Sequence, residues 1–542
     1  VDKTTFIKEW WENEDAVTLI TRPRRFGKTL NMSMLECFFS GKYADRADLF
    51  EGLDIWKEEK YRLLQGTWPV IFLSFAGIKH SDFANTKETL NRLIANLYRQ
   101  YASMLEDGKF TEADRKAYQE VNGSMSDPVA ALSLNLLCEW LYRYYGKKCI
   151  LLLDEYDTPL QEAYVHGFRE EMAAYLRALF NNTFKTNSYL ERGIMTGITR
   201  VSKESIFSDL NNLKVITTTS EQYASAFGFT ENEVFEAMYM QGIPADEQNR
   251  VKFWYDGFTF GKVSDIYNPW SITMYLDEQR FDTYWANTSS NGLVGKLVRE
   301  GDRKIKMDFE MLLEGGFIEA RIDEQIVFDQ LSGSLNAIWS LLLASGYLKV
   351  IDTVKKDQDS LPVYRLALTN HEVKLMFYRM IEGWFAETSE FGDFVSAMFR
   401  GDVRSMNHYM NKVALTTFSC FDAGKKPSEK KEPERFYHGF VLGLLVDKAD
   451  RYMVKSNRES GLGRYDVIME PKDTVDPAVI MEFKVFDKED GEKSLEDTAQ
   501  NALRQIEEKK YDTDLLLRGI PEDKILKYGF AFEGETCLIR KA

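Results

Sequence analysis

The chain is poor in cysteine and has no long apolar run. Its 542 residues include five cysteines, none of them in a CxxC pair: Cys37, Cys138, Cys149, Cys420 and Cys537. That scatter favours reduced thiols and argues against a zinc site or a disulfide framework. No apolar run approaches the ~20 residues of a membrane-spanning helix, and the opening VDKTTFIKEW is typical of neither a signal peptide nor a transit peptide. These absences predict a cytoplasmic protein that acts without a membrane.

A surplus of positive charge is also missing. Lys and Arg number 69 against 85 Asp and Glu, a formal net charge of −16, which argues against a protein that coats DNA nonspecifically. Contact with nucleic acid would therefore need a local basic surface. A hydrophobic content of 44% with 13% aromatic residues indicates a globular chain. This length exceeds a single hydrophobic core, and we expect about two to four domains.

The most informative motif is a basic turn after a β-prone apolar run, RPRRFGKT at residues 22–29. In a phosphate-binding loop the backbone N–H groups of such a turn surround an anion, and the following helix directs its positive end at the same oxygens. Lys28 is placed to reach the terminal phosphates of a nucleotide, and the Thr29 hydroxyl to ligate Mg²⁺. The turn before them is formed by Arg25, Phe26 and Gly27. Arg22 stands where the usual motif has its first glycine, so a basic surface turn that caps a helix stays an alternative.

A second motif lies at residues 149–157, CILLLDEYD. Its unbroken apolar run suits a strand buried on both faces of a parallel sheet. At the end of that strand Asp154 can hold the water shell of Mg²⁺, and Glu155 can orient the water that attacks a γ-phosphate. This is the Walker B arrangement, although an acidic pair also closes strands by chance. Together with the basic turn, it predicts a site for ATP and Mg²⁺.

A third candidate strand, Gly193–Ile198, ends in Thr199 and Arg200. A polar residue at that point can sense the γ-phosphate, and Arg200 can bring positive charge to the transition state. The alternative is that Arg200 only pairs with a carboxylate.

Strands and helices alternate through the first part of the chain, as in a parallel α/β sheet. The candidate strands are Ala16–Ile20, Val70–Ser74, Cys149–Leu153, Gly193–Ile198 and Val215–Thr218. Helices are expected between them, among others at residues 83–106 and 129–145.

The pattern changes after an aromatic-rich segment at residues 253–270, and helices then predominate to about residue 400. A helix at residues 336–346 followed by a strand at 347–351 is typical of a winged-helix-type module. Asn370 caps a further helix with Glu372 in its first turn. A plain helical spacer is the alternative. The charged, proline-containing run at residues 425–435 predicts a linker.

A second chemical constellation lies in a predicted hairpin near the C-terminus. Strands at residues 465–469 and 478–485 place Asp466 beside Glu482. Glu482 and Lys484 are two residues apart, so they project to the same face of their strand. Asp466 and Glu482 can hold Mg²⁺ through oxygen ligands, and Lys484 can position or deprotonate an attacking water.

Three further residues belong to this predicted site. Glu434 opens the preceding helix and can add a carboxylate, while Gln505 and Tyr511 on the following helix can touch a phosphate or the water of a metal. The alternative is an exposed hairpin face that carries an ion pair between Glu482 and Lys484.

Residues 1 to about 280 resemble the AAA-ATPase-like domain of a large bacterial and archaeal family. The resemblance rests on RPRRFGKT and on two later segments, WYDGFTFG at residues 254–261 and IYNPWSI at 266–272. Residues from about 400 to the end resemble the PD-(D/E)XK nuclease domain that these proteins carry at the C-terminus. Asp466 follows Tyr465 where the name of that superfamily has proline.

The residues and the resemblance together predict three regions and two sites. The regions are a P-loop domain at 1–275, a helical or winged-helix-like coupling region at 276–400 and a PD-(D/E)XK nuclease-like α/β domain at 401–542. The nucleotide and Mg²⁺ are expected at Arg25, Phe26, Gly27, Lys28, Thr29, Asp154 and Arg200, with Glu155 as a catalytic residue. Mg²⁺ or Mn²⁺ is expected at Asp466, Glu482 and Glu434, with Asp466, Glu482 and Lys484 as catalytic residues and Gln505 in support.

We therefore expect a protein that binds and hydrolyses ATP and controls a divalent-metal-dependent DNA nuclease, in defence against mobile DNA or in its processing. ATP would shift the population between two domain arrangements. Two other functions stay open. One is a signalling-type ATPase switch whose C-terminal domain binds a partner or DNA without cleaving it, and the other is an ATPase motor that moves DNA. The expected partners are a nucleotide and nucleic acid, and a homo-oligomer is also considered.

Overall fold

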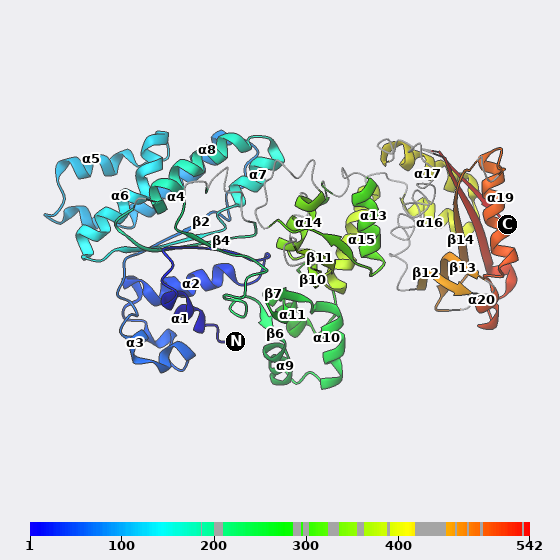
Figure 1. Ribbon diagram of the computed structural model, residues 1–542, viewed down its shortest axis with the longest axis horizontal. Helices are drawn as coiled ribbons and strands as arrows, with labels where there is room; N and C mark the ends of the chain where they lie inside the picture. Colours follow the sequence, from blue (N-terminus) through cyan, green and yellow to red (C-terminus); the bar gives the residue numbers. More distant parts are fainter. Residues whose placement is uncertain are drawn as a thin grey trace. The chain divides into compact units, whose positions relative to one another are not determined.

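The computed structural model forms two compact units, whose elements are labelled in Figure 1. The first unit comprises Val1–Leu297 and Phe317–Val373, and the second comprises Val298–Gly316 and Lys374–Ala542. The structure describes residues 1–185, 187–199, 207, 210–285, 294–295, 297, 303–323, 335–354, 362–386, 391–417, 451–460, 463–473, 476–487, 491–533 and 536–542. None of the helices in these ranges is both long enough and apolar enough to cross a membrane.

A five-stranded parallel sheet lies at the centre of the first unit, in the order β2-β3-β4-β1-β5. Its strands are β1 (Val17–Thr21), β2 (Val70–Ser74), β3 (Cys149–Asp154), β4 (Leu190–Gly197) and β5 (Leu213–Ile216). β1 and β3 are buried along their whole lengths, as expected for strands covered by helices on both faces. The predicted parallel α/β sheet is confirmed, with β5 two residues earlier in the chain than expected.

Helices precede and connect these strands, and their ends follow signals in the sequence. They are α1 (Thr5–Glu12), α2 (Lys28–Phe39), α3 (Glu59–Arg62), α4 (Phe83–Arg99), α5 (Glu112–Glu120), α6 (Asp127–Tyr145), α7 (Thr158–His166) and α8 (Arg169–Phe180). α6 has a proline in its first turn and ends at Gly146 in the left-handed region, the common asymmetry of helix ends. The helix expected at residues 83–106 ends at Arg99, and a 3-10 turn covers Ala102–Glu106.

Residues 229–278, which include the aromatic-rich segment at residues 253–270, form a small sheet in the order β6-β8-β7 with three helices. These elements are β6 (Phe229–Thr230), α9 (Glu231–Met240), α10 (Gln248–Tyr255), β7 (Phe258–Phe260), β8 (Val263–Tyr267) and α11 (Pro269–Glu278). The segment WYDGFTFG thus joins the end of α10 to β7, and IYNPWSI joins β8 to α11. Asn268 caps α11, because its side chain accepts hydrogen bonds from the backbone N–H groups of Trp270 and Ser271.

Beyond this segment the described chain contains a three-stranded antiparallel sheet, in the order β10-β11-β9. The elements are α13 (Arg303–Leu313), β9 (Ile318–Ala320), α14 (Leu335–Ala344), β10 (Leu348–Val354), β11 (Val363–Leu368) and α15 (His371–Ala386). The helix-then-strand order typical of a winged-helix-type module is present in α14 and β10, and a plain helical spacer is wrong. Ala337 and Leu341 of α14 join the hydrophobic core of the main sheet, which explains their place in the first unit.

The second unit contains a mixed five-stranded sheet in the order β12-β13-β14-β15-β16. Its elements are α16 (Phe391–Arg400), α17 (Val403–Thr417), β12 (Tyr452–Ser460), β13 (Gly463–Pro471), β14 (Ala478–Val485), α19 (Leu495–Glu508), α20 (Thr513–Leu517), β15 (Ile525–Glu533) and β16 (Thr536–Lys541). β14 and β15 are parallel neighbours, so the chain between them has to cross over, and α19 provides that connection. The linker expected at residues 425–435 lies outside the described residues.

The two faces of this sheet are buried against different helices, with the two-residue period of a strand. Odd-numbered residues of β13 and β14 pack in one core with α16 and α17: Val467, Met469, Val479, Met481 and Phe483. Even-numbered residues Ile468, Ala478 and Ile480 pack in another core with α19 and α20. The even-numbered residues Asp466, Glu482 and Lys484 therefore lie on the α19 face.

Candidate nucleotide and nuclease sites

The residues of the predicted phosphate loop lie between the end of β1 and the start of α2. Gly27 is the N-cap of α2 and has φ +79°, and Arg25 has φ +65°. This left-handed backbone at two nearby positions turns the chain sharply enough to enter the helix. Arg22 has an ordinary backbone conformation, and its N–H donates to the Gly197 carbonyl at 3.1 Å. It thus continues the pairing of β1 with β4, so this position does not need the glycine of the usual motif.

Lys28 lies inside the loop. It is buried, and its Nζ donates to the carbonyls of Arg22 (3.1 Å) and Pro23 (2.9 Å). Burial lowers the pKa of Lys28, although the charges of Glu155 and Asp157 act in the opposite direction. The ammonium is therefore held by backbone carbonyls and lies in the field of the acidic residues that follow β3.

Asp154 connects the phosphate loop to the neighbouring strands. Its Oδ2 accepts a hydrogen bond from Thr29 Oγ1 at 2.7 Å and from Ser74 Oγ at 3.5 Å, and its Oδ1 accepts from Thr196 Oγ1 at 2.5 Å. The strand order places β4, with Thr196, between β1 and β3. Hydroxyl and carboxylate oxygens are the ligands that Mg²⁺ prefers, so this donor set fits the ion.

Thr196 is a residue that the sequence analysis missed. Besides Asp154, it contacts the backbone N–H of Glu155 at 3.3 Å through its hydroxyl, and Glu155 itself has φ +50°. A polar residue inside the otherwise apolar strand GIMTGI was the available signal. Thr196 thus fixes both members of the acidic pair at the end of β3.

The segment after β4 is hydrogen-bonded to Asp157. The Oδ2 atom of Asp157 accepts hydrogen bonds from the N–H groups of Ile198 and Thr199 and from Thr199 Oγ1, at 2.9 to 3.0 Å. A Cβ at Gly197 would lie 2.7 Å from the ring of Tyr156, so glycine is required there. Thr199 is therefore bound to Asp157 rather than exposed at the strand end, and Arg200 lies outside the described residues.

The aromatic-rich segment packs against the phosphate loop. Phe26 lies edge-on to Phe258 and Phe260, with ring centroids 4.7 and 5.4 Å apart, and the Arg25 guanidinium lies 4.7 Å from the Trp270 ring centroid. These contacts explain why WYDGFTFG and IYNPWSI accompany this loop in one chain.

The Arg22 side chain packs against the same aromatic-rich segment. Its Nη1 donates to the Thr217 carbonyl at 2.6 Å, and its guanidinium lies 4.5 Å from the Phe260 ring centroid. Burial lowers the pKa of Arg22 to about 9.

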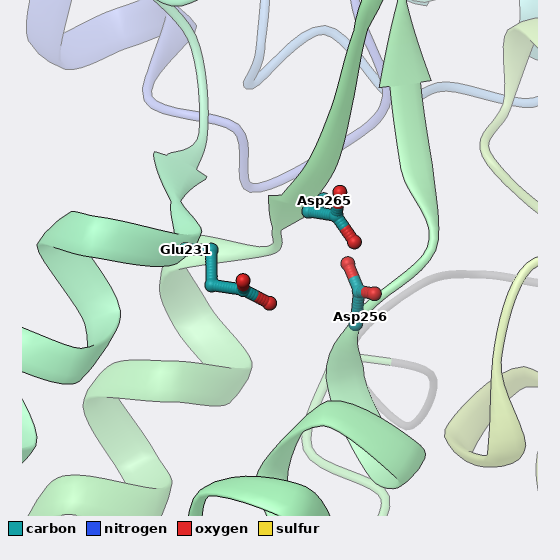
Figure 2. A group of neighbouring side chains, drawn as sticks. All are labelled: Glu231, Asp256 and Asp265. Atoms are coloured by element: carbon teal, nitrogen blue, oxygen red, sulfur yellow. The ribbon is translucent and has the colours of Figure 1, made fainter.

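Three carboxylates of residues 229–278 lie close together, as Figure 2 shows: Glu231, Asp256 and Asp265. The Lys252 ammonium binds within the group, at 2.5 Å from Glu231 and 2.9 Å from Asp265. Burial raises the pKa of Asp256 to about 6, and the charge of Asp265 adds to that shift. The sequence analysis missed this cluster, in which the lysine supplies the neutralising cation and joins α9, α10 and β8.

Three of the predicted nuclease residues, Asp466, Glu482 and Lys484, lie on the α19 face of the second sheet. The backbone N–H of Phe483 donates to Asp466 Oδ2 at 2.9 Å, so the carboxylate of β13 is held beside β14. Glu482 is only 2% exposed and accepts a hydrogen bond from Gln505 Nε2. The alternative of an exposed hairpin face therefore does not describe Glu482. Lys484 follows on the same face and is half-buried.

Gln505 and Tyr511 complete this group. Gln505 Nε2 also donates to the Tyr511 hydroxyl at 3.1 Å. Burial raises the pKa of Tyr511, the hydrogen bond from Gln505 lowers it, and the nearby charges of Glu482 and Asp466 raise it further. Gln505 lies on α19 as expected, whereas Tyr511 lies in the turn between α19 and α20. Glu434 lies outside the described residues.

The approach of α19 depends on Gly529 of β15, which the sequence analysis did not identify. Gly529 is the β-sheet neighbour of Glu482, and a Cβ there would lie 2.5 Å from the Ala499 carbonyl of α19. Glycine thus lets α19 lie close enough for Gln505 to reach Glu482. The carboxylates of Asp466 and Glu482 supply oxygen ligands that fit Mg²⁺ or Mn²⁺.

Comparison with known proteins agrees with the two domains in which these residues lie. The family described as "Predicted AAA-ATPase" matches residues 1–207, and the PD-(D/E)XK nuclease superfamily matches residues 432–542. An "Uncharacterized protein in vnfD 5'region" from Azotobacter chroococcum mcd 1 is 25% identical over 375 residues, which cover 69% of this chain and 64% of that protein. The chain thus spans less than two thirds of this relative. The chain carries an AAA-ATPase-like domain at residues 1–207 and a PD-(D/E)XK nuclease superfamily domain at residues 432–542.

Proposed function

We propose that this protein binds and hydrolyses ATP at the phosphate loop and that this reaction controls a divalent-metal-dependent DNA nuclease at Asp466 and Glu482. One observation carries the proposal: each domain gathers two oxygen-donor side chains from separate elements and a lysine. Thr29 donates to Asp154 and follows Lys28 in the chain, and Asp466, held by the Phe483 N–H, lies on the sheet face that also carries Glu482 and Lys484.

At the first site the residues have separate roles. Lys28 binds the terminal phosphates, Thr29 and Asp154 hold Mg²⁺, and Glu155 orients the attacking water. A Mg²⁺ ion held by Thr29 and Asp154 would supply positive charge beside the phosphate oxygens. Arg25, Phe26 and Gly27 form the turn around the phosphates, and we propose Arg200 as a further positive charge beside them.

At the second site Asp466 and Glu482 bind the metal, with Glu434 as a further proposed ligand. Gln505 orients the Glu482 carboxylate, and Lys484 positions the water that attacks the phosphodiester. A divalent ion held by these carboxylates would supply positive charge beside the phosphodiester that water attacks.

Residues 276–400 are proposed to couple the two reactions. This region contributes Phe317–Val373 to the first compact unit and Val298–Gly316 to the second. A segment that is shared by both units is suited to pass a change in one of them to the other. We keep 1–275, 276–400 and 401–542 as the proposed functional regions.

The decisive experiment uses two variants and one matched control. Glu482→Gln in the full chain is expected to abolish cleavage of plasmid DNA with Mg²⁺ or Mn²⁺ while ATP binding persists. Lys28→Ala is expected to abolish ATP binding by calorimetry. The control is Glu470→Gln, because Glu470 is also a buried carboxylate on the α19 face but is paired with Lys455 and Arg518. The control should cleave like the wild type.

Equal cleavage by wild type and Glu482→Gln would overturn the nuclease and indicate contamination. No cleavage by the wild type, combined with ATP-dependent binding of DNA or protein, would favour the signalling switch. DNA-stimulated hydrolysis that Lys28→Ala abolishes would favour a DNA motor.

We further propose that the DNA is mobile DNA, in defence or in processing, as the resemblance to the bacterial and archaeal family suggests. Cells that express the wild type should resist phage infection or plasmid entry better than cells that express Glu482→Gln. Equal efficiencies would reject this role without affecting the biochemical proposal.

A further inference from the structure

The phosphate loop is attached to two later segments through one backbone carbonyl. The Arg24 carbonyl accepts hydrogen bonds from Trp285 Nε1 at 3.0 Å and from Asn268 Nδ2 at 3.3 Å. Both donors are 1% exposed. Since Lys28 takes the carbonyls of Arg22 and Pro23, three successive carbonyls of the loop have side-chain donors.

Both donors depend on Glu372 in the first turn of α15. One oxygen of this carboxylate accepts a hydrogen bond from the backbone N–H of Trp285 at 2.6 Å, and the other accepts from the Ser271 hydroxyl at 2.8 Å. Ser271 lies in the first turn of α11, which Asn268 caps. Glu372 therefore fixes the two segments that in turn fix the Arg24 carbonyl.

The same residues are tightly packed. The Trp285 ring lies 5.4 Å from Tyr347 and 5.7 Å from Phe258, measured between centroids. Gly346 has φ +85°, and a Cβ there would lie 2.8 Å from Pro23. Interiors of this density shift between discrete arrangements rather than absorb a displacement, so a movement of the loop is passed on.

Glu372 is only 1% exposed, and an apolar residue would fill this space without the desolvation cost of a buried carboxylate. The carboxylate, unlike an apolar side chain, accepts hydrogen bonds from two segments at once and so fixes their orientation. The helix that carries it also crosses the boundary between the compact units, which falls between Val373 and Lys374.

We propose that Glu372 and Trp285 are positioning residues for the nucleotide site, through which the phosphate loop and the first turn of α15 control one another. The inference rests on the proposed binding of ATP and deepens it. By linkage, if ordering of the α15 turn favours ATP, then ATP must order that turn to the same extent.

The test begins with Trp285→Phe, which removes the indole N–H but keeps an aromatic ring against Tyr347. It should weaken Mg²⁺-ATP binding about threefold to tenfold, the value of one hydrogen bond. In the wild type, Mg²⁺-ATP should slow amide hydrogen exchange at residues 371–375, and at equal occupancy this protection should be smaller in the variant. The matched control is Trp140→Phe, because Trp140 is equally buried in the core of the first unit and should leave both readouts unchanged.

A second pair of variants allows for misfolding. Glu372→Gln can still accept from the Trp285 N–H and donate to the Ser271 hydroxyl, so it should retain most of the coupling, whereas Glu372→Ala should lose it. The proposal would be overturned if Trp285→Phe has a native Tm and circular dichroism spectrum, binds Mg²⁺-ATP with wild-type affinity and shows unchanged protection from hydrogen exchange at residues 371–375. If the wild type does not bind Mg²⁺-ATP at all, the proposed function fails instead.

Discussion

The proposed nucleotide site and the proposed nuclease site are built in different ways. In the first, Thr29, Asp154 and Thr196 come from the ends of neighbouring parallel strands and from the helix after β1. In the second, Asp466 and Glu482 lie on one face of an antiparallel strand pair, and α19 covers them. The first site depends on strand order and the second on register, because a slip of one residue in either strand would turn its carboxylate to the face opposite the other carboxylate.

The largest expected effect comes from exchanging one carboxylate at each site. Asp154→Asn should lower ATP hydrolysis, and Asp466→Asn should lower DNA cleavage, each on the order of 10² to 10³-fold, because metal-ion stabilisation of the transition state is worth several kcal/mol. Both activities are measured on both variants at saturating Mg²⁺. Asp466→Asn should leave ATP binding unchanged. If it weakens both activities equally, the two sites are not separate.

A smaller effect is expected at Gln505, which donates a hydrogen bond to the proposed metal ligand Glu482. Gln505→Ala removes the hydrogen bond to Glu482 and should weaken Mn²⁺ binding by about 10 to 100-fold, as is typical for such partners. Calorimetric titration with Mn²⁺ measures this directly. The control is Gln500→Ala on the same helix, because Gln500 is exposed and contacts Glu496. Equal Mn²⁺ affinity in the wild type and Gln505→Ala would show that Gln505 does not orient the ligand.

Alanine substitution of two glycines distinguishes the phosphate loop from the sheet of the second unit. Gly529→Ala places a methyl group against the Ala499 carbonyl and should lower the free energy of unfolding by about 1–3 kcal/mol through overpacking. Gly27→Ala meets no atom within 4 Å but needs φ +79°, which costs about 1–2 kcal/mol. Urea unfolding measures both costs. Only Gly529→Ala should also weaken Mn²⁺ binding, and a loss of Mn²⁺ affinity in Gly27→Ala would contradict this distinction.

The smallest effect concerns pH and the acidic cluster of the first unit. Burial raises the pKa of Asp256 from 3.8 to about 6, so the folded state binds the carboxyl proton of Asp256 more tightly than the unfolded state does. The resulting stabilisation of the folded state is complete below pH 3.8 and is lost as the pH rises through about 6. Asp256→Asn should therefore gain about 1 kcal/mol relative to the wild type between these limits, a value reduced for partial exposure.

Urea unfolding of the Asp256→Asn variant and the wild type at a series of pH values provides the measurement. A difference in unfolding free energy that does not change with pH would contradict the assignment.

Much of the fold was predictable because its signals are local. The apolar runs of β1 to β4 and the ends of α6 follow from periodicity and from Pro and Gly positions. Two elements of the sheet next to α14, β9 and β11, were not predicted, because β9 has only 3 residues and β11 is half-buried with little alternation.

The candidate sites were predictable to the extent that their residues share a motif. RPRRFGKT and LLLDE predict phosphate-binding and metal-binding residues by residue type and spacing. Thr196, Asp157 and Gly529 were missed because their roles depend on neighbours that are distant in the sequence. The acidic cluster around Lys252 was missed for the same reason.

By itself the sequence determined which chemical groups this protein carries and which face of each strand or helix they occupy, since side-chain type and backbone period are local properties. The tertiary structure decided which of those groups meet. Strand order brought Thr196 to Asp154, a missing Cβ at residue 529 let Gln505 reach Glu482, and the path of α15 joined Glu372 to the carbonyl of Arg24 through Trp285. Such meetings depend on packing between distant segments, which no local pattern encodes.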